Sequence, residues 1–292
     1  MALVVLAGVV LSGSASGPAA PISLPELTSR PRPHATERIS WGPGPSQFAD
    51  FWKPDGKGPF PVAVLIHGGC WQAAFGLDLM DYAAEDLRRH GVAVWNIEYR
   101  RLGEPGGGYP GTFADVGAAL DHLRQEAPRR HLALDRLVVV GHSAGGHLGL
   151  WAAGRSRLPS NSPLRTRDPL KIGAVISLGG VADLETPSQA CGGDATVRDL
   201  VGPATASRHD PFADTAPLSL EPFAARQVLV HGESDTIAPV SMGEIYKQKA
   251  HRKGAEVELQ RIRGQGHFDL IAPGSPAWET NVRPLILRAV GR

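Results

Sequence analysis

This chain of 292 residues has few cysteines and no excess of charge of either sign. It contains two cysteines, Cys70 and Cys191, and its formal net charge is +1. Two cysteines without a suitably spaced group of histidines argue against a zinc site, so we expect no bound metal. A net charge near zero gives no sign of the basic surface that nucleic-acid-binding proteins need, so we expect no nucleic-acid partner.

The chain also lacks an apolar run at its N-terminus long enough to anchor it in a membrane. The run from Leu3 to Leu11 is too short for a stable transmembrane helix. Small residues follow it, and candidate cleavage points lie after Gly17 and Ala19. Residues 1–19 therefore resemble a signal peptide, although no lysine or arginine precedes the apolar run. We expect a secreted or periplasmic protein without a membrane anchor. A cytoplasmic protein with an apolar N-terminus is the alternative.

The two cysteines leave two alternatives open. An exported protein with an even number of cysteines can form one disulfide. Both Cys70 and Cys191 follow strand-like segments, so both can lie at the same edge of a sheet. Two free, buried thiols are the other possibility.

From residue 61 onward, strand-like and helix-like segments alternate along the chain. This pattern is typical of an α/β domain with a mainly parallel sheet, here of about eight strands, covered by helices on both faces. We expect one domain over 37–292, starting with a hairpin, and a proline-rich, extended linker at 20–36. Residues 184–222 lack a clean periodicity, and we expect a small capping insertion over the strand ends.

The chain is organised around one strand-turn-helix segment. Four apolar residues at 137–140 lead into Gly141-His142-Ser143-Ala144-Gly145, and a helix-like apolar pattern follows. The glycines permit a very tight turn, which places Ser143 at its apex and exposes the hydroxyl at the start of a helix. A glycine-rich turn with a chance serine is the alternative. The interpretation therefore depends on whether the sequence also supplies a base and an acid for Ser143.

A serine hydroxyl needs a base to become a nucleophile, and the base needs an acid to orient it. His267 follows the last predicted strand in a glycine-rich stretch and is the best candidate base. Asp235 follows the preceding strand and is the best candidate acid, with Asp183 second and Glu233 third. The order Ser143, Asp235, His267 is the order used by hydrolases on this type of sheet. Taken alone, Asp235 could be a helix cap and His267 an ordinary loop histidine.

A second motif supplies candidate oxyanion donors. His67-Gly68-Gly69-Cys70 ends the strand at 61–66, where small residues let the backbone approach a substrate. The backbone N–H groups of Ala144, Gly69 and Cys70 are the expected donors to the oxyanion. We expect His67 to brace this loop.

Two aromatic side chains lie beside these motifs. Trp71 directly follows the oxyanion loop, and His142 precedes the serine. We expect both to contact the substrate, and for Trp71 packing under the loop is the alternative. His142 and His147 have no partners at the spacing that a metal site requires.

HGGCW at 67–71, together with GHSAGGH at 141–147, resembles the α/β-hydrolases of the esterase/lipase group. The pair is similar to the kynurenine-formamidase-like and the acetyl- or feruloyl-esterase-like branches, and the resemblance covers about residues 37–292. It implies an α/β-hydrolase fold, a triad of Ser143, Asp235 and His267, and an oxyanion hole at Gly69, Cys70 and Ala144. Cys70 departs from the HGGG of hormone-sensitive-lipase-like esterases.

The resemblance implies a serine hydrolase that cleaves carboxylic esters of small or medium substrates and needs no cofactor. Arylformamidase or small-peptide hydrolase activity with the same residues is the first alternative, because HGGCWQ is close to the HGG-x-W pattern of arylformamidases. A non-catalytic α/β-hydrolase scaffold is the second alternative. The presence of all three triad candidates counts against that scaffold.

Overall fold

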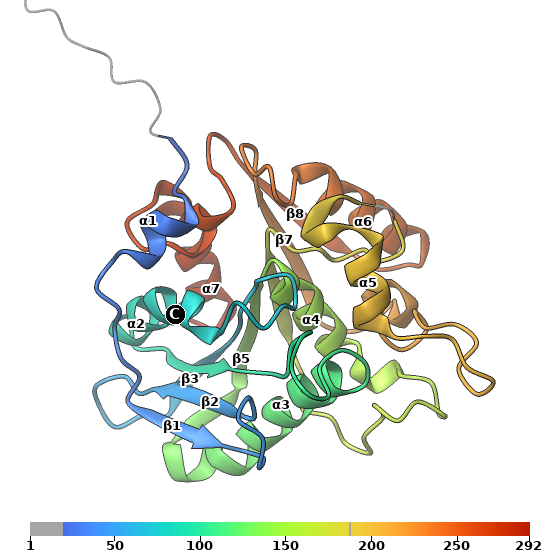
Figure 1. The fold of residues 1–292 in the computed structure, drawn as a ribbon. Helices are drawn as coiled ribbons and strands as arrows, with labels where there is room; N and C mark the ends of the chain where they lie inside the picture. Colours follow the sequence, from blue (N-terminus) through green and yellow to red (C-terminus); the bar gives the residue numbers. More distant parts are fainter. Residues whose placement is uncertain (1–19, 187) are drawn as a thin grey trace, which may run out of the picture.

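The computed structural model describes residues 20–186 and 188–292. The expected signal peptide at 1–19 lies outside the described residues. Eight strands form one sheet in the order β1-β2-β4-β3-β5-β6-β7-β8 (Figure 1). The strands are β1 (Glu37–Ser40), β2 (Phe48–Trp52), β3 (Phe60–Ile66), β4 (Ala93–Ile97), β5 (Leu132–His142), β6 (Ala174–Leu178), β7 (Arg226–Gly232) and β8 (Val257–Ile262).

The N-terminal hairpin is antiparallel and pairs with β4 in the same sense, whereas β3 to β8 pair in parallel. The predicted mainly parallel sheet of about eight strands is therefore confirmed. Its helices are α1 (Leu24–Thr28), α2 (Asp81–Arg89), α3 (Gly111–Arg130), α4 (Ala144–Ala153), α5 (Asp194–Val201), α6 (Val240–Arg252) and α7 (Arg283–Ala289). Short helical turns include η1 (Leu77–Met80), η2 (Arg155–Arg157), η3 (Ala190–Gly192), η4 (Pro217–Leu220), η5 (Phe268–Ile271) and η6 (Trp278–Val282).

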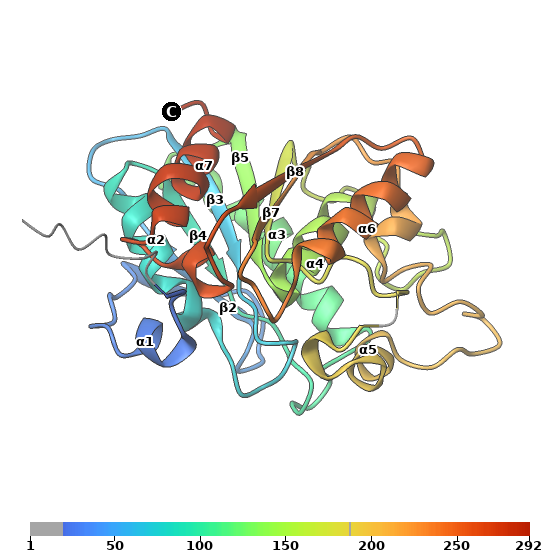
Figure 2. The ribbon, with the colours of Figure 1, turned by 90° about the horizontal axis from the view of Figure 1, so that it is seen from above.

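Helices cover both faces of the sheet, which explains why the central strand β3 is apolar at every position. All residues of β3 are buried. Val62 and Val64 belong to the core shared with α3, α4 and α6, whereas Ala63 and Leu65 belong to the core shared with α2 and α7. Alternate side chains point to opposite faces of a strand, so a strand between two helical layers needs apolar residues throughout. Figure 2 shows these two helical layers from above.

The segment at 20–36 differs from the extended linker that we expected. It contains α1, whose first turn is capped by the Ser23 hydroxyl and holds Pro25, a residue that suits this position. Leu27 of α1 is fully buried in the core beside α2 and α7. The N-terminal segment is therefore packed against the domain.

The segment at 184–222, for which we expected a small capping insertion, contains η3, α5 and η4. Leu200 and Val201 of α5 are buried in the main core.

Among the described helices, none has both the length and the apolar character required to cross a bilayer.

Candidate active site

Ser143 lies at the turn between β5 and α4 in a backbone conformation that few residues adopt. Its φ is 53° and its ψ is −120°, and such conformations cost about 1–3 kcal/mol unless neighbouring structure holds them. The Ser143 N–H donates to the Leu178 carbonyl over 2.8 Å, and the Ser143 carbonyl accepts from the Gly146 N–H over 2.9 Å. Backbone strain held at one serine is a feature of functional sites.

The flanking glycines are required because the turn packs against backbone. A Cβ atom at position 141 would lie 2.0 Å from the Gly145 carbonyl oxygen, and one at position 145 would lie 2.1 Å from the Ile66 carbonyl oxygen. A larger residue at position 141 would push the start of α4 away from β5, and one at position 145 would push it away from the end of β3. The glycine spacing in the motif therefore follows from the close approach of α4 to the sheet.

His267 and Asp235 form a tight pair at the ends of β8 and β7. His267 Nδ1 and Asp235 Oδ2 are 2.6 Å apart, and both side chains are buried. The other carboxylate oxygen, Oδ1, accepts the N–H groups of Ile237 and Ala238, each over 2.8 Å. An Asp that accepts from Nδ1–H leaves Nε2 of the imidazole unprotonated and able to take a proton.

The end of β6 connects this pair to the serine turn. Leu178 accepts the Ser143 N–H, and a Cβ atom on the next residue, Gly179, would lie 3.0 Å from His267 Nδ1 and 3.1 Å from Asp235 Oδ2. The structure thus brings Ser143, Asp235 and His267 to one edge of the sheet, where the carboxyl ends of parallel strands form binding sites in open α/β sheets.

The two weaker acid candidates lie elsewhere. Asp183 forms an ion pair with Lys249 at 2.8 Å and accepts the Thr186 hydroxyl over 2.6 Å. Glu233 is exposed to solvent. Of the three candidates, the structure pairs only Asp235 with the His267 imidazole.

His67 braces the loop after β3, as expected from the motif. Its Nε2 atom is 2.8 Å from Glu98 Oε1, and its ring stacks on Tyr99 with centroids 4.4 Å apart. Burial opposes ionisation of Glu98, but His67 and Arg101 outweigh it and lower the pKa of this carboxyl. We had not singled out Glu98, although its position directly after β4 was a signal that could have identified it.

The loop at Gly69, Cys70 and Trp71 has three successive residues with positive φ, at 101°, 54° and 57°. It lies directly over the serine turn, because a Cβ atom at position 68 would be 2.8 Å from the Ser143 Cβ atom. Within the described parts of the chain, the N–H groups of Gly69, Cys70 and Ala144 have no protein acceptor. Unpaired N–H groups beside a serine are suited to bind an oxyanion.

Cys70 and Cys191 are joined by a disulfide, with their Cα atoms 5.0 Å apart. Of the two alternatives for these cysteines, the structure contains the bonded form. The bond links the loop over Ser143 to the segment just before α5. It spans 121 residues of sequence, so it closes a long loop in the unfolded chain.

Removing this disulfide is expected to lower both stability and turnover. For a loop of 121 residues, chain entropy alone predicts a loss of about 5 kcal/mol. A Cys70→Ala/Cys191→Ala variant should therefore show a Tm lower by several degrees in thermal unfolding, together with a reduced kcat. Dithiothreitol should reproduce both effects in the wild type and leave the double variant unchanged. Equal Tm and kcat in both proteins would contradict this prediction.

The structure does not place Trp71 and His142 as expected for residues that touch a substrate. Trp71 is fully buried and contacts the edge of His147, with ring centroids 5.5 Å apart. His142 is buried under His267, and its Nε2 atom lies 3.2 Å from the His267 carbonyl oxygen. Burial, and then the neighbouring His267, hold the pKa of His142 well below its ordinary range. Both side chains therefore support the loops from below.

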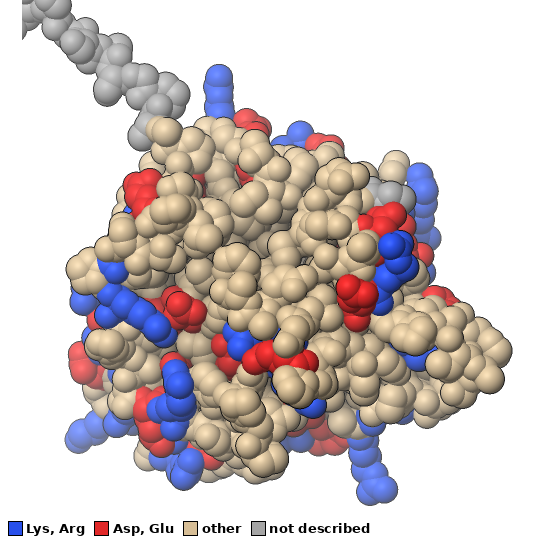
Figure 3. Space-filling model, viewed as in Figure 1, with Lys and Arg blue, Asp and Glu red and all other residues tan. Residues whose placement is uncertain are grey.

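The face over these strand ends is shallowly hollowed near its middle in the space-filling view, with acidic and basic side chains around the hollow (Figure 3). In the described residues, no group of three or more histidine, cysteine, aspartate or glutamate side chains could hold a metal ion. Ser143, the pair of His267 and Asp235, and the N–H groups of the loop after β3 thus lie near one another at this edge of the sheet.

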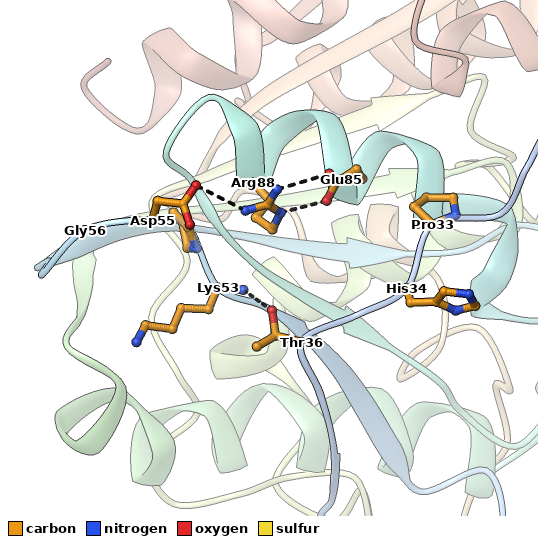
Figure 4. Close-up of a pocket in the computed structure, with 9 residues that line it drawn as sticks. Pro33, His34, Thr36, Lys53, Asp55, Gly56, Glu85 and Arg88 are labelled. Atoms are coloured by element: carbon orange, nitrogen blue, oxygen red, sulfur yellow. Dashed lines mark hydrogen bonds and ion pairs between the residues drawn. The ribbon is translucent and has the colours of Figure 1, made fainter.

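Another surface hollow, of about 640 Å³, lies at the opposite edge of the sheet (Figure 4). It is lined by residues of the N-terminal segment at 33–36, by residues that follow β2 and by residues of α2. Trp52, the last residue of β2, pairs with Val94 near the start of β4. Its arginine, Arg88, is already paired with Glu85 at 2.7 Å and with Asp55 at 3.7 Å. This hollow is therefore separate from the site at Ser143.

Comparison with known proteins assigns the chain to a family. The model of the BD-FAE family matches residues 50–249. The chain belongs to the BD-FAE family. This result confirms the α/β-hydrolase of the esterase/lipase group that the HGGCW and GHSAGGH motifs indicated.

Several relatives of this BD-FAE protein are named as esterases. Esterase LipC of Mycobacterium tuberculosis is 28% identical over 249 residues, which cover 80% of this chain and 60% of LipC. The chain thus spans about 60% of the length of that relative. Kynurenine formamidase avaC of Aspergillus versicolor is 33% identical over 132 residues, covering 41% of this chain and 43% of that protein.

Solved structures share the fold. Thermogutta terrifontis esterase 2, phosphonylated by sarin, has a TM-score of 0.72 at 18% identity and covers 90% of this chain and 97% of its own. Esterase B from Lactobacillus rhamnosis has a TM-score of 0.73 at 20% identity, and the match covers 89% of this chain and 88% of esterase B. At these identities, the similarity shows that the fold is shared.

Proposed function

We propose that this BD-FAE protein is a serine hydrolase that cleaves carboxylic esters of small or medium substrates. The observation that carries the proposal is the pair of His267 and Asp235, 2.6 Å apart, beside the strained turn at Ser143. The unpaired N–H groups over the serine support it further, because acyl transfer needs donors for a developing oxyanion. The esterases among its relatives support an ester as the substrate.

In the proposed first half-reaction, Ser143 Oγ attacks the ester carbonyl carbon while His267 Nε2 takes the hydroxyl proton. The carbonyl oxygen becomes an oxyanion, which the N–H groups of Ala144, Gly69 and Cys70 stabilise. Asp235 holds the imidazolium through Nδ1–H. The intermediate then collapses, the C–O bond to the alcohol breaks, and His267 gives its proton to the leaving alcohol.

In the second half-reaction, water replaces the alcohol. His267 Nε2 takes a proton from the water as its oxygen attacks the acyl carbon of the Ser143 ester. Collapse of this second intermediate releases the carboxylic acid and returns the proton to Ser143 Oγ. The proposed cycle uses only side chains, backbone N–H groups and water.

Arylformamidase activity is the second candidate, and two observations favour it. One is the similarity to kynurenine formamidase avaC over 41% of the chain. The other is the HGGCW stretch at 67–71, which has the HGG-x-W form. The same nucleophile, base and donors would act on a formamide, with an amine as the leaving group.

The two candidates can be separated by relative kcat/KM. We expect hydrolysis of p-nitrophenyl esters from acetate to decanoate, with the highest kcat/KM at a short or medium chain. N-formylkynurenine should be a poorer substrate by the same measure. A kcat/KM for N-formylkynurenine above that of every ester would replace the esterase proposal with the formamidase. No turnover of either substrate class, together with no reaction with a fluorophosphonate, would favour a non-catalytic scaffold.

We also propose that the protein is exported to the periplasm or secreted. The Cys70–Cys191 disulfide supports this location, because disulfides persist mainly in oxidising compartments. Fractionation of the producing cells tests it. Recovery of the protein only from the reducing cytoplasm, with both thiols free, would contradict it.

A further inference from the structure

The buried carboxylate of Asp269 bonds both to the loop that bears His267 and to the N-terminal segment. Asp269 Oδ2 accepts the Gly266 N–H over 2.6 Å, and Oδ1 accepts the Ile22 N–H over 3.2 Å. Asp269 is 3% exposed. Asp269 thus links Gly266, which directly precedes His267, to Ile22, which lies 247 positions before Asp269 in the sequence.

The N-terminal segment also packs directly on this loop. A Cβ atom at Gly266 would lie only 2.6 Å from the Pro21 Cβ atom. Gly266 has no side chain at the point where Pro21 covers it. Pro21 and Ile22 therefore cover the loop from outside, and His142 supports it from below through the His267 carbonyl.

Further contacts fix the N-terminal segment to the body of the domain. Leu27 is fully buried in the same core as Leu270 and Ile271 of η5, which directly follows His267. Arg30 donates to the Pro273 carbonyl over 2.8 Å, and Arg32 pairs with Asp81 at 2.6 Å. Figures 1 and 2 show α1 beside the chain that follows His267.

We propose that residues 20–32 form a strap that positions His267, with Asp269 as the positioning residue. The proposal rests on the proposed function, because it assumes that His267 is the base. Gly264 and Gly266 make the loop flexible by sequence, and Gly264 has a positive φ of 72°. The strap restricts this loop, so the imidazole keeps its pairing with Asp235. Displacement of a reacting group by about 1 Å can cost about a hundredfold in rate.

Two variants test whether the strap positions His267 or only stabilises the fold. Ile22→Pro removes the N–H that donates to Asp269, together with the Ile22 side chain that packs against the core beside α2 and α7. Asp269→Asn keeps the N-terminal segment unchanged and replaces one of the two acceptor oxygens by a donor. Thr28→Ala is the matched control, since Thr28 is exposed and, among the described residues, its hydroxyl bonds only to carbonyls within α1. Each protein is assayed with p-nitrophenyl butyrate for kcat, KM and the pH dependence of kcat/KM, and Tm is measured in parallel.

We expect kcat to fall about ten- to hundredfold in Ile22→Pro and Asp269→Asn, with KM within a factor of about two. The kinetic pKa seen in kcat/KM should shift, because the pairing of His267 with Asp235 is altered. Thr28→Ala should match the wild type. A merely structural role would lower Tm without shifting that kinetic pKa or separating kcat from KM.

Wild-type values of kcat and of the kinetic pKa in both variants would overturn the strap while leaving the proposed function intact. So would a fall in Tm with unchanged kinetics at temperatures where the variants are folded. The proposed function fails separately if the folded wild type hydrolyses no ester, or if Ser143→Ala retains wild-type turnover. The strap proposal would then fail with it.

Discussion

Replacing Ser143 by alanine is expected to lower kcat for p-nitrophenyl butyrate by about 10⁵- to 10⁶-fold. Removal of the nucleophile of a serine hydrolase costs about this much, because the base and acid have no function without it. The substitution removes one oxygen atom at a side chain that is 3% exposed. Alanine also lacks the serine hydroxyl that the proposed acyl-enzyme requires. Steady-state hydrolysis by purified wild type and variant gives the ratio directly.

Ser156→Ala is the matched control for this loss. Ser156 lies in η2, just after α4, and is exposed to solvent. Its substitution should leave kcat and KM unchanged. Thermal unfolding should show all three proteins folded. Turnover by Ser143→Ala within about tenfold of the wild type would rule out Ser143 as the nucleophile.

Replacing Asp235 by asparagine is expected to lower kcat by about 10⁴-fold. The asparagine oxygen can still accept the N–H groups of Ile237 and Ala238, so the turn should be retained. Its amide group facing His267 would donate a hydrogen bond, which favours the tautomer with the proton on Nε2. That tautomer cannot take the proton of Ser143. The measurement is kcat at saturating ester, with the fold checked by circular dichroism.

Asp183→Asn tests whether the effect is specific to the acid beside His267. Asp183 pairs with Lys249 and, in the described residues, forms no hydrogen bond or ion pair with His267 or Asp235. We expect its substitution to reduce Tm modestly and to leave kcat within about threefold. A larger loss of kcat in Asp183→Asn than in Asp235→Asn would reverse the assignment of the acid.

The candidate site was predictable from sequence because each of its parts follows a strand. Ser143 directly follows β5, whereas Asp235 and His267 lie in the loops that follow β7 and β8. Parallel strands end at one edge of the sheet. Alternation of strands and helices was enough to predict this arrangement. The order of residues along the chain therefore predicted their proximity in space.

What the sequence did not predict depends on contacts between distant parts of the chain. α1 has five residues, too few for a periodic pattern to distinguish a helix from a linker. Leu27 is buried because it packs into a core formed by segments distant in the sequence. The pairing of Cys70 with Cys191 depends on the path of the segment before α5. Trp71 was expected at a substrate, yet its side chain is fully buried in the main core, in a loop whose residues have positive φ.

The most direct test of the account is to locate the atom that becomes covalently modified during the reaction. The purified protein is treated with a fluorophosphonate, digested, and mapped by mass spectrometry, with Ser143→Ala as the control. We predict a single adduct on Ser143, lost in Ser143→Ala, whose formation abolishes ester hydrolysis in proportion. Continued ester hydrolysis by a protein with no adduct on Ser143 would contradict the serine mechanism.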